Sequence, residues 1–262
     1  FMGSLREFQK EAVDKMLDRD SGTLSAPTGS GKTVMALAII AERKQPALIV
    51  VHNKELVNQW IERIEAFIGI PRAEVGIIGA GKKIFGPRLT VGIINSIYKV
   101  SSEIRHHFGH IVVDECHRAP SRTFTEGLKH FDARYLLGLS ATPWRRDKLS
   151  RLIYWNVGDI VHKIEQGSLM DSGDVLRAEV ITRETNFSTG FDPSEQYSLM
   201  LSDLTKDRGR NALIVKDVVQ EAREGSGVCL VLTDRKGHVD ELAGMIEAEG
   251  IKADRLTGDL PD

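Results

Sequence analysis

A glycine-rich turn near the N-terminus has the residue types that bind phosphate. It lies between a short strand candidate and a segment of helical periodicity, which disfavours the alternative of a Gly/Ser-rich turn with an incidental lysine. Glycines let backbone N–H groups curl around phosphate oxygens, a lysine reaches the β- and γ-phosphates, and a threonine hydroxyl ligates Mg²⁺. The turn therefore predicts an ATP and Mg²⁺ site after Ala26, made by Pro27, Thr28, Gly29, Ser30, Gly31, Lys32 and Thr33.

Two carboxylates follow a second apolar run, Ile111–Val113. Asp114 can hold Mg²⁺ through water, and Glu115 can orient or deprotonate an attacking water. Taken alone, an apolar run that ends in Asp-Glu is more often a strand leaving the core. Because the phosphate-binding turn lies upstream, we predict that Lys32, Asp114 and Glu115 act in hydrolysis and that Thr33 and Asp114 ligate the metal.

The elements that must position these residues follow an alternating pattern. Short apolar runs alternate with helical patterns through residues 1–165, which is typical of βαβ units and a mostly parallel, doubly wound sheet. The fold class that we predict is α/β. The expected strands are Gly22–Ser25, Ala47–Val51, Glu74–Ile78, Thr90–Ile94, Ile111–Val113 and Tyr135–Ser140, and the expected helices are Glu7–Leu17, Lys32–Glu42, Lys54–Phe67 and Ser121–His130.

A second α/β pattern begins after an irregular stretch in which Val175–Thr182 indicates an edge strand or a connection. About 58 residues remain from Thr205 on, too few for a complete α/β domain of ordinary size. We expect an ATP-binding domain over 1–165, a connection over 166–204, and the first part of a truncated second domain over 205–262. The second domain is expected to contain helices Arg208–Arg223 and Gly237–Glu249 and strands Val228–Leu232 and Ile251–Leu256.

The composition is that of an ordinary globular chain. Of its 262 residues, 41% are hydrophobic and 27% are charged. The longest uncharged apolar run, Val34–Ala41, is far shorter than the roughly 18 residues of a membrane-spanning helix. Cys116 and Cys229 form no CxxC pair, which argues against a disulfide scaffold or a structural zinc site. We therefore expect a cytoplasmic protein with no membrane partner.

The charges are distributed unevenly, although the net charge is only −2. Residues 1–165 contain 24 Lys and Arg against 18 Asp and Glu, whereas residues 166–262 contain 11 against 19. A basic first part can bind a polyanion such as nucleic acid. Charges that only solvate the surface are the alternative interpretation.

The run Asp114-Glu115-Cys116-His117, downstream of the phosphate-binding turn, resembles the superfamily 2 helicases and translocases. Other segments resemble motifs of this superfamily in the same order along the chain. They are Leu5–Gln9 for adenine contact, His52–Leu56 and Asn95-Ser96 for nucleic-acid contact, Ser140–Pro143 for coupling, and Leu230–Arg235 with Thr257-Gly258 at the start of a second RecA-like domain.

The resemblance implies a RecA-like P-loop NTPase domain with a mostly parallel sheet, followed by an incomplete second RecA-like domain. The cofactors are then ATP and Mg²⁺. By resemblance, Arg6 and Gln9 contact the adenine, His117 joins Lys32, Asp114 and Glu115 in catalysis, Ser140 and Thr142 couple the nucleotide state to movement, and Asn53, Lys54, Asn95 and Ser96 contact nucleic acid.

Within the superfamily, Gly138–Asp147 is most similar to restriction-enzyme motor subunits, phage recombination helicases and excision-repair translocases. The Asp207…Arg210-Asn211 pattern is similar as well. Two departures, Lys148 in place of a common Gly and Cys116 in a DECH rather than a DEAH box, do not touch a catalytic role. This branch acts on duplex or branched DNA, which favours DNA over RNA as partner.

The resemblance thus implies an ATP-dependent DNA helicase or double-stranded DNA translocase. We expect this chain to be monomeric, to bind ATP and to be poorly active alone, with a nuclease or specificity domain or subunit outside it. The alternatives are an RNA helicase of the superfamily, another P-loop NTPase such as a nucleotide kinase, and a non-hydrolysing nucleic-acid-binding module. A metal cluster at His106, His107 and His110 is a further alternative, but these residues lack Cys or acidic neighbours in the sequence, so we expect a solvated loop there.

Overall fold

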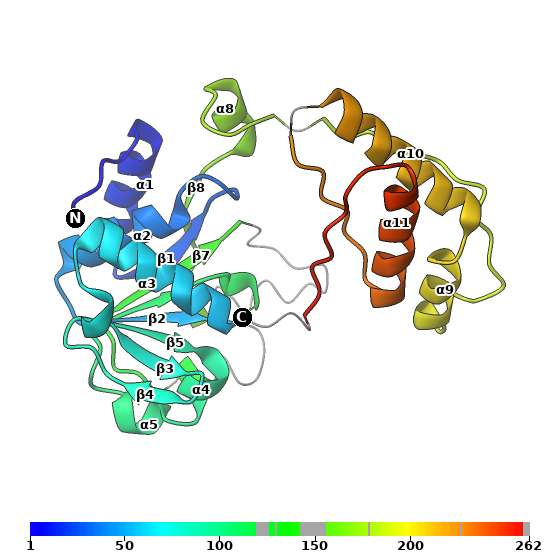
Figure 1. The fold of residues 1–262 in the computed structure, drawn as a ribbon. Helices are drawn as coiled ribbons and strands as arrows, with labels where there is room; N and C mark the ends of the chain where they lie inside the picture. Colours follow the sequence, from blue (N-terminus) through cyan, green and yellow to red (C-terminus); the bar gives the residue numbers. More distant parts are fainter. Residues whose placement is uncertain (119–125, 129, 142–155, 178, 226, 259–262) are drawn as a thin grey trace. The chain divides into compact units, whose positions relative to one another are not determined.

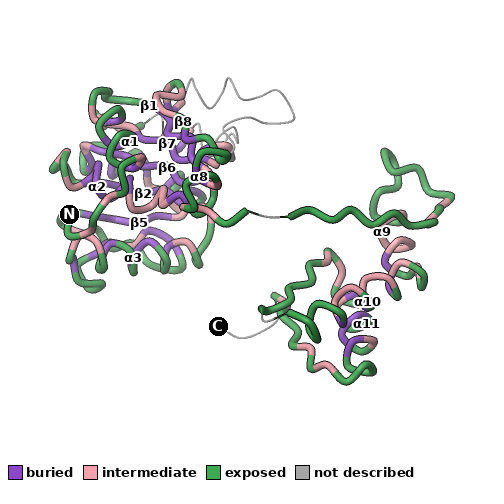
Figure 2. Tube along the Cα trace, turned by 90° about the horizontal axis from the view of Figure 1, so that it is seen from above, coloured by how far each residue is buried: buried purple, intermediate pink, exposed green. Residues whose placement is uncertain are grey.

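The computed structural model describes residues 1–118, 126–128, 130–141, 156–177, 179–225 and 227–258 (Figure 1). The chain divides into two compact units, Phe1–Ala178 and Glu179–Asp262. Figure 2 shows how burial is distributed along each unit. The division between them falls inside the segment 166–204 that the sequence analysis assigns to a connection.

An eight-stranded sheet forms the centre of the first unit, in the order β4-β3-β5-β2-β6-β7-β1-β8. Neighbouring strands are parallel except for the antiparallel pair β3–β4. This mostly parallel α/β sheet confirms the predicted fold class. The strands are β1 (Ser21–Ser25), β2 (Ala47–Val51), β3 (Gly76–Gly79), β4 (Lys82–Ile84), β5 (Leu89–Ile93), β6 (His110–Val113), β7 (Tyr135–Ser140) and β8 (Ile160–Lys163).

Apolar side chains on both faces of the sheet form the core of the first unit, as a parallel sheet covered by helices requires. Along β2, Ala47, Ile49 and Val51 belong to one cluster of buried residues, whereas Leu48 and Val50 belong to the other. Helices α1 (Glu7–Leu17), α2 (Lys32–Arg43) and α3 (Lys54–Ile68) contribute to the first cluster, and the short helices α4 (Ile94–Tyr98) and α5 (Ser101–Ile104) contribute to the second.

Helix α3 shows how local sequence sets the bounds of an element. Its N-cap is Asn53, whose side-chain oxygen accepts a hydrogen bond from Leu56 N at 2.9 Å. It ends at Ile68, and its C-cap is Gly69, whose φ of +73° suits a residue without a Cβ. The buried face includes Trp60 and Ile64, as the helical spacing of apolar residues predicts.

The second unit contains helices around a small core. The helices are α9 (Tyr197–Leu204), α10 (Arg208–Glu224) and α11 (Lys236–Ala248), while α8 (Gln166–Asp171) belongs to the first unit. The core cluster of this unit contains four buried apolar residues from α10 and α11: Val215, Val219, Leu242 and Ile246. Asp207 caps α10 by accepting a hydrogen bond from Arg210 N at 2.6 Å.

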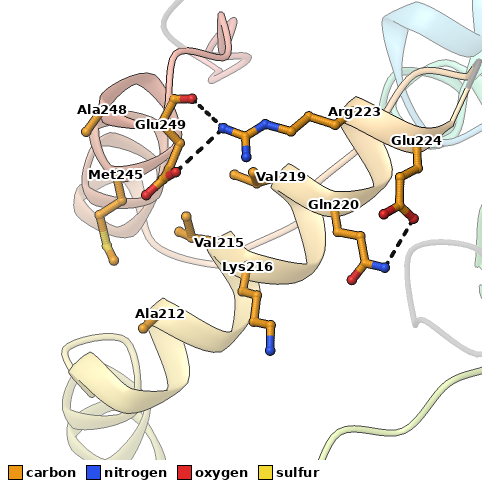
Figure 3. Close-up of a pocket in the computed structure, with 10 residues that line it drawn as sticks. All are labelled: Ala212, Val215, Lys216, Val219, Gln220, Arg223, Glu224, Met245, Ala248 and Glu249. Carbon is orange, nitrogen blue, oxygen red and sulfur yellow. Dashed lines mark hydrogen bonds and ion pairs between the residues drawn. The ribbon is translucent and has the colours of Figure 1, made fainter.

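A hollow of about 630 Å³ lies between α10 and α11 (Figure 3). Val215 and Val219 lie on its α10 side and Met245 on its α11 side. Arg223 of α10 donates a hydrogen bond to the Glu249 carbonyl at 3.0 Å and so connects the two helices at one end. The α10–α11 pair is therefore held by few apolar contacts and by polar bonds at its margin.

Several predicted elements differ from the structure. The segments Val228–Leu232 and Ile251–Leu256, predicted as strands, contain no strand, and Val228 and Leu232 are 99% and 82% exposed. A strand requires a neighbour for its backbone groups, and the described residues of the second unit provide none. The described residues of Val175–Thr182 also contain no strand, and most of the predicted helix Ser121–His130 lies outside the described residues.

The edge strands β4 and β8 are absent from the sequence prediction. All three residues of β4 are exposed, and β8 is only partly buried. The apolar pattern that reveals a buried strand is therefore weak in both. The interior strands β2 and β7, in contrast, have the bounds that the sequence predicts.

Candidate functional site

The carboxyl ends of neighbouring strands bring the predicted motifs to one edge of the sheet. The order β5-β2-β6-β7-β1 places the loops that follow these strands side by side, because all five run parallel. Ser25, the last residue of β1, is level with Ser140, the last residue of β7. Ligands of open parallel sheets bind at this edge. From β1 across to β5, the strand ends and the residues just after them include the phosphate-binding turn, Ser140, Asp114, Asn53 and Asn95.

The phosphate-binding turn has the backbone conformation of an anion cradle. Gly29 and Gly31 have φ values of +84° and +83°, in the left-handed region where a side chain is strained. A Cβ at Gly31 would also lie only 2.5 Å from Gln9 Nε2. Gly31 is the N-cap of α2, so the unsatisfied N–H groups of that helix face the turn.

The Lys32 ammonium lies within the turn. Its Nζ donates hydrogen bonds to the carbonyls of Ala26 at 3.0 Å and Pro27 at 3.1 Å. Burial lowers the pKa of Lys32, while the carboxylates of Glu115 and Asp114 oppose this shift. The cation is thus held close to the two predicted catalytic carboxylates.

A chain of polar contacts links the carboxylate pair to β7. The Asp114 carboxylate, through Oδ1, accepts a hydrogen bond from Glu115 N at 3.0 Å. Glu115 Oε2 lies 3.1 Å from His117 Nδ1, and this ring nitrogen lies 3.0 Å from Ser140 Oγ. The structure therefore brings Glu115, His117 and Ser140 together, which the sequence predicts only through the resemblance.

Glu115 has a strained backbone. Its φ of +50° is unusual for a residue other than glycine. Such conformations persist only where the surrounding structure imposes them, and they cluster at functional sites. The bonds to Asp114 and His117 on either side of Glu115 fix its position.

Cys116, which makes the box DECH, is a buried packing residue. Burial raises the pKa of its thiol to about 12. A Cβ placed on Gly138 would lie 3.1 Å from its sulfur, which shows how closely the neighbouring strand approaches. The residue takes no part in the polar chain, consistent with the expectation that this departure touches no catalytic role.

Trp60 is a residue of the site that the sequence analysis assigns only to a helix face. Its indole N–H donates a hydrogen bond to Asp114 Oδ2 at 2.9 Å, and the side chain is buried. The apolar spacing on α3 gives no sign of this contact, because the spacing describes the helix and not its partner across the sheet. A Trp at a core position can signal such a bond, since a buried indole N–H usually finds an acceptor.

Thr33 and Asp114, the two predicted metal ligands, line one cavity of about 210 Å³. Their oxygens are the ligand type that Mg²⁺ prefers. The Asp114 carboxylate oxygens retain acceptor capacity beyond the two bonds they receive. The residues present therefore fit a Mg²⁺ ion. The other lining residues come from α3: Leu56, Gln59, Trp60, Glu62 and Arg63.

The predicted adenine-contacting residues form contacts within the protein. Gln9 is buried; its Oε1 accepts from Arg6 N at 2.9 Å and its Nε2 donates to the Ser30 carbonyl at 2.8 Å. Gln9 thus connects α1 directly to the phosphate-binding turn. Arg6 is exposed and pairs with Asp174 at 2.8 Å.

The predicted nucleic-acid residues lie where α3 and α4 begin, directly after β2 and β5. Asn53 and Lys54 are exposed at the start of α3, and Asn95 and Ser96 lie in α4, with Asn95 exposed. The coupling residue Thr142 lies outside the described residues.

The three histidines considered as a metal cluster have separate environments. His106 pairs with Asp132 at 2.9 Å, and the ring of His107 lies 5.4 Å from that of Phe85. His110 is fully buried at the start of β6, 2.9 Å from Arg43 Nη1, so the expectation of a solvated loop is wrong for this residue. Within the described residues, no group of three or more His, Cys, Asp or Glu could hold a metal.

The chain is similar to one restriction-enzyme family and to proteins named as helicases and translocases. Residues 2–145 match the profile of the family described as "Type III restriction enzyme, res subunit". The chain is 37% identical over 159 residues to "DNA 3'-5' translocase XPB2" of Sulfurisphaera tokodaii, covering 61% of this chain and 35% of that protein. It is 27% identical over 267 residues to "DNA 3'-5' helicase XPB" of Kineococcus radiotolerans, covering 96% of this chain and 46% of that protein. The chain thus spans less than half the length of these two relatives.

Among solved structures, the fold is similar to that of the UvsW helicase from bacteriophage T4. The TM-score is 0.53 at 22% sequence identity, over 59% of this chain and 58% of the other. This similarity supports the fold. Within the part of the chain that the structure describes, no helix has the length and apolar character to cross a membrane.

Proposed function

The chain belongs to the type III restriction enzyme res subunit family of superfamily 2, and we propose that it is the ATP-binding motor part of a DNA helicase or double-stranded DNA translocase. The observation that carries the proposal is the meeting of three motifs at adjacent strand ends. Lys32 in the turn after β1, Asp114 and Glu115 after β6, and Ser140 on β7 lie together, with His117 between the last two.

The side chains divide the work of ATP hydrolysis. Mg²⁺, when bound, neutralises charge on the β- and γ-phosphates, and Thr33 and Asp114 would hold it. Lys32 supplies a point charge to the same phosphates. Glu115, which can accept a proton from the attacking water, is held by His117 at 3.1 Å. Because His117 also contacts Ser140, a change at the γ-phosphate can be passed to β7.

Nucleic acid would bind along the starts of α3 and α4, which follow β2 and β5. Asn53, Lys54, Asn95 and Ser96 lie there, next to the nucleotide edge of the sheet. The excess of Lys and Arg in residues 1–165 supports a polyanion partner. The printed names of the two relatives, a DNA translocase and a DNA helicase, favour DNA over RNA.

The proposed division of the chain has a first RecA-like domain over 1–165, a connection over 166–204, and the start of a second RecA-like domain over 205–262. The described residues of the second unit contain no strand. In the superfamily, arginines from late motifs of the second RecA-like domain also hold the γ-phosphate, a contact worth about 10³-fold or more in rate. We expect this chain to bind ATP and to hydrolyse it slowly.

The test is an ATPase assay on this chain. The same assay is run on a longer form of the protein that matches the full length of the relatives. Duplex, single-stranded and branched DNA and RNA are compared as activators. DNA stimulation supports the proposal, whereas stimulation by RNA alone favours an RNA helicase. Turnover that no nucleic acid changes favours another P-loop enzyme, and DNA binding without any turnover favours a non-hydrolysing module.

A salt titration tests the binding surface. If lysines and arginines of the first unit neutralise DNA phosphates, the logarithm of the affinity falls linearly with the logarithm of the salt concentration. Lys54→Gln should reduce that slope by about one. An unchanged slope in this variant would move the DNA contact away from the start of α3.

A further inference from the structure

The Asp114 carboxylate is held from two sides by groups with different origins. Oδ1 accepts the backbone N–H of Glu115 at 3.0 Å, a bond made within the loop itself. Oδ2 accepts the indole N–H of Trp60 at 2.9 Å, and Trp60 lies on α3, 54 positions earlier in the chain. Trp60 is 2% exposed and Asp114 is 9% exposed, so water does not compete freely for either group.

We propose that Trp60 is a positioning residue that sets the orientation of the Asp114 carboxylate for Mg²⁺; the proposal rests on the proposed nucleotide function of the site. A carboxylate at the end of a strand can rotate about χ1 and χ2, and the loop bond to Oδ1 alone leaves the second oxygen free. The indole bond fixes Oδ2. Charge-assisted bonds of this kind are shorter and stronger than neutral ones.

The cavity next to this bond is the place where we expect the Asp114 carboxylate to meet the metal. Thr33 and Asp114 line it together with Trp60. The indole therefore bonds to one predicted metal ligand and lines the same cavity as the other. Groups that hydrogen-bond metal ligands typically change metal affinity or activity about 10- to 100-fold when they are removed.

The same geometry excludes a purely apolar role for Trp60. Ile61 and Ile64 fill the core from the same helix and have no polar atom to offer. A Phe at position 60 would keep one aromatic ring in the core and lose the N–H together with the five-membered ring that carries it. Trp60→Phe thus removes the hydrogen bond with part of the packing, and Ile64→Val is the control that perturbs only the packing of α3.

The experiment measures ATP affinity of the full chain by calorimetry, with saturating Mg²⁺ and with EDTA. In the wild type, Mg²⁺ should increase affinity. In Trp60→Phe, this increase should fall about tenfold while metal-free affinity stays the same. In Ile64→Val, the Mg²⁺ effect should be unchanged although the melting temperature falls. An unchanged Mg²⁺ effect in Trp60→Phe would overturn the inference, whereas a wild type without any ATP binding would overturn the proposed function instead.

A second measurement covers a Trp60→Phe protein that does not fold. Replacing Trp60 by 3-benzothienylalanine keeps the bicyclic shape and exchanges N–H for sulfur. The tenfold loss should recur in that protein. In ¹⁵N-tryptophan spectra of the wild type, the Trp60 indole signal should shift on addition of Mg²⁺ with ATP and stay in place with ATP and EDTA. An indole signal that ignores Mg²⁺ would overturn the inference.

Discussion

The two units of the chain differ in what holds their apolar residues. In the first unit, each interior strand has a neighbour on both sides, and buried clusters lie on both faces of the sheet. In the second unit, the buried cluster has four residues, and Leu230 and Leu232 are 71% and 82% exposed. Helices close their hydrogen bonds within one segment, whereas strands need a partner. The comparison teaches that the site of the first unit is built on a sheet of paired strands, whereas the described residues of the second unit form helices and contain no strand.

Each unit also contains a buried polar group, and the two groups serve different ends. Asp114 in the first unit faces a cavity beside the phosphate-binding turn. In the second unit, Asn211 is buried with its Nδ2 donating to the Thr205 carbonyl at 2.9 Å, and its Oδ1 lies 2.9 Å from His238 Nε2. His238 Nδ1 lies 2.7 Å from Thr233 Oγ1, so this network connects α10 to the start of α11. The Asp207…Arg210-Asn211 pattern is thus used for capping and packing.

The largest expected effect is a loss of ATP hydrolysis when a residue of the first unit is changed but not when one of the second unit is changed. Lys32→Ala removes the ammonium group that we propose contacts the β- and γ-phosphates, and hydrolysis should fall by about 10²- to 10³-fold or to background. Steady-state ATPase assays measure the loss. The control is Lys216→Ala, at an exposed position of α10, and it should retain the wild-type rate. Equal activity of Lys32→Ala and wild type would place the nucleotide site elsewhere.

Truncating a buried core residue should affect the folding of the two units differently. Leu48→Ala in β2 and Leu242→Ala in α11 each remove a buried side chain, at a cost of about 2–5 kcal/mol. Because the second unit has only four residues in its core cluster, Leu242→Ala should unfold it while ATP affinity stays unchanged. Urea unfolding followed by circular dichroism, together with calorimetric ATP binding, checks both variants. Loss of ATP binding in Leu242→Ala would show that the first unit depends on the second.

A smaller effect should appear in the pH dependence of the first unit. Burial, reinforced by the Arg43 guanidinium, lowers the pKa of His110 from 6.5 to about 3. The unfolded chain therefore binds a proton that the folded chain excludes between these values. The contribution of His110 to the free energy of unfolding is complete above pH 6.5. Below pH 6.5, the free energy of unfolding falls by about 1.4 kcal/mol per pH unit.

The variant His110→Gln tests this dependence. A glutamine oxygen can accept the bond from Arg43 that His110 Nε2 receives, and it does not titrate in this range. The free energy of unfolding, measured in urea at pH 7.5 and pH 5.5, should then depend less on pH than in the wild type. The same slope in both proteins would show that other groups cause the acid sensitivity.

The smallest perturbation probes the two cysteines. Cys116 in the first unit is buried with a pKa raised to about 12, whereas Cys229 in the second unit is exposed. The thiolate is the reactive form, so Ellman's reagent at pH 8 should modify Cys229 quickly and Cys116 only after unfolding. Counting released chromophore before and after adding denaturant measures this. Rapid reaction of both thiols in the native chain would contradict the burial of β6 and its following loop.

Local sequence determined much of the site. Residues 26–33 contain the glycines, the lysine and the threonine of the turn, and Asp114 and Glu115 end an apolar run. The predicted and observed bounds agree for β2, β7 and α1, because these elements have strong apolar periodicity and clear ends. The catalytic and metal-binding roles of these residues remain predictions, as do the roles of Arg6, Gln9 and the nucleic-acid residues.

Tertiary structure alone decided which of these parts meet. The sheet order places Ser140 between the phosphate-binding turn and Asp114, and it brings Trp60 to Asp114 and Arg43 to His110. Periodicity identifies the buried face of an element, but it carries no information on which other element covers that face. Pairing between distant segments depends on the whole set of strands, and this is also why the apolar runs 228–232 and 251–256 form no strand here.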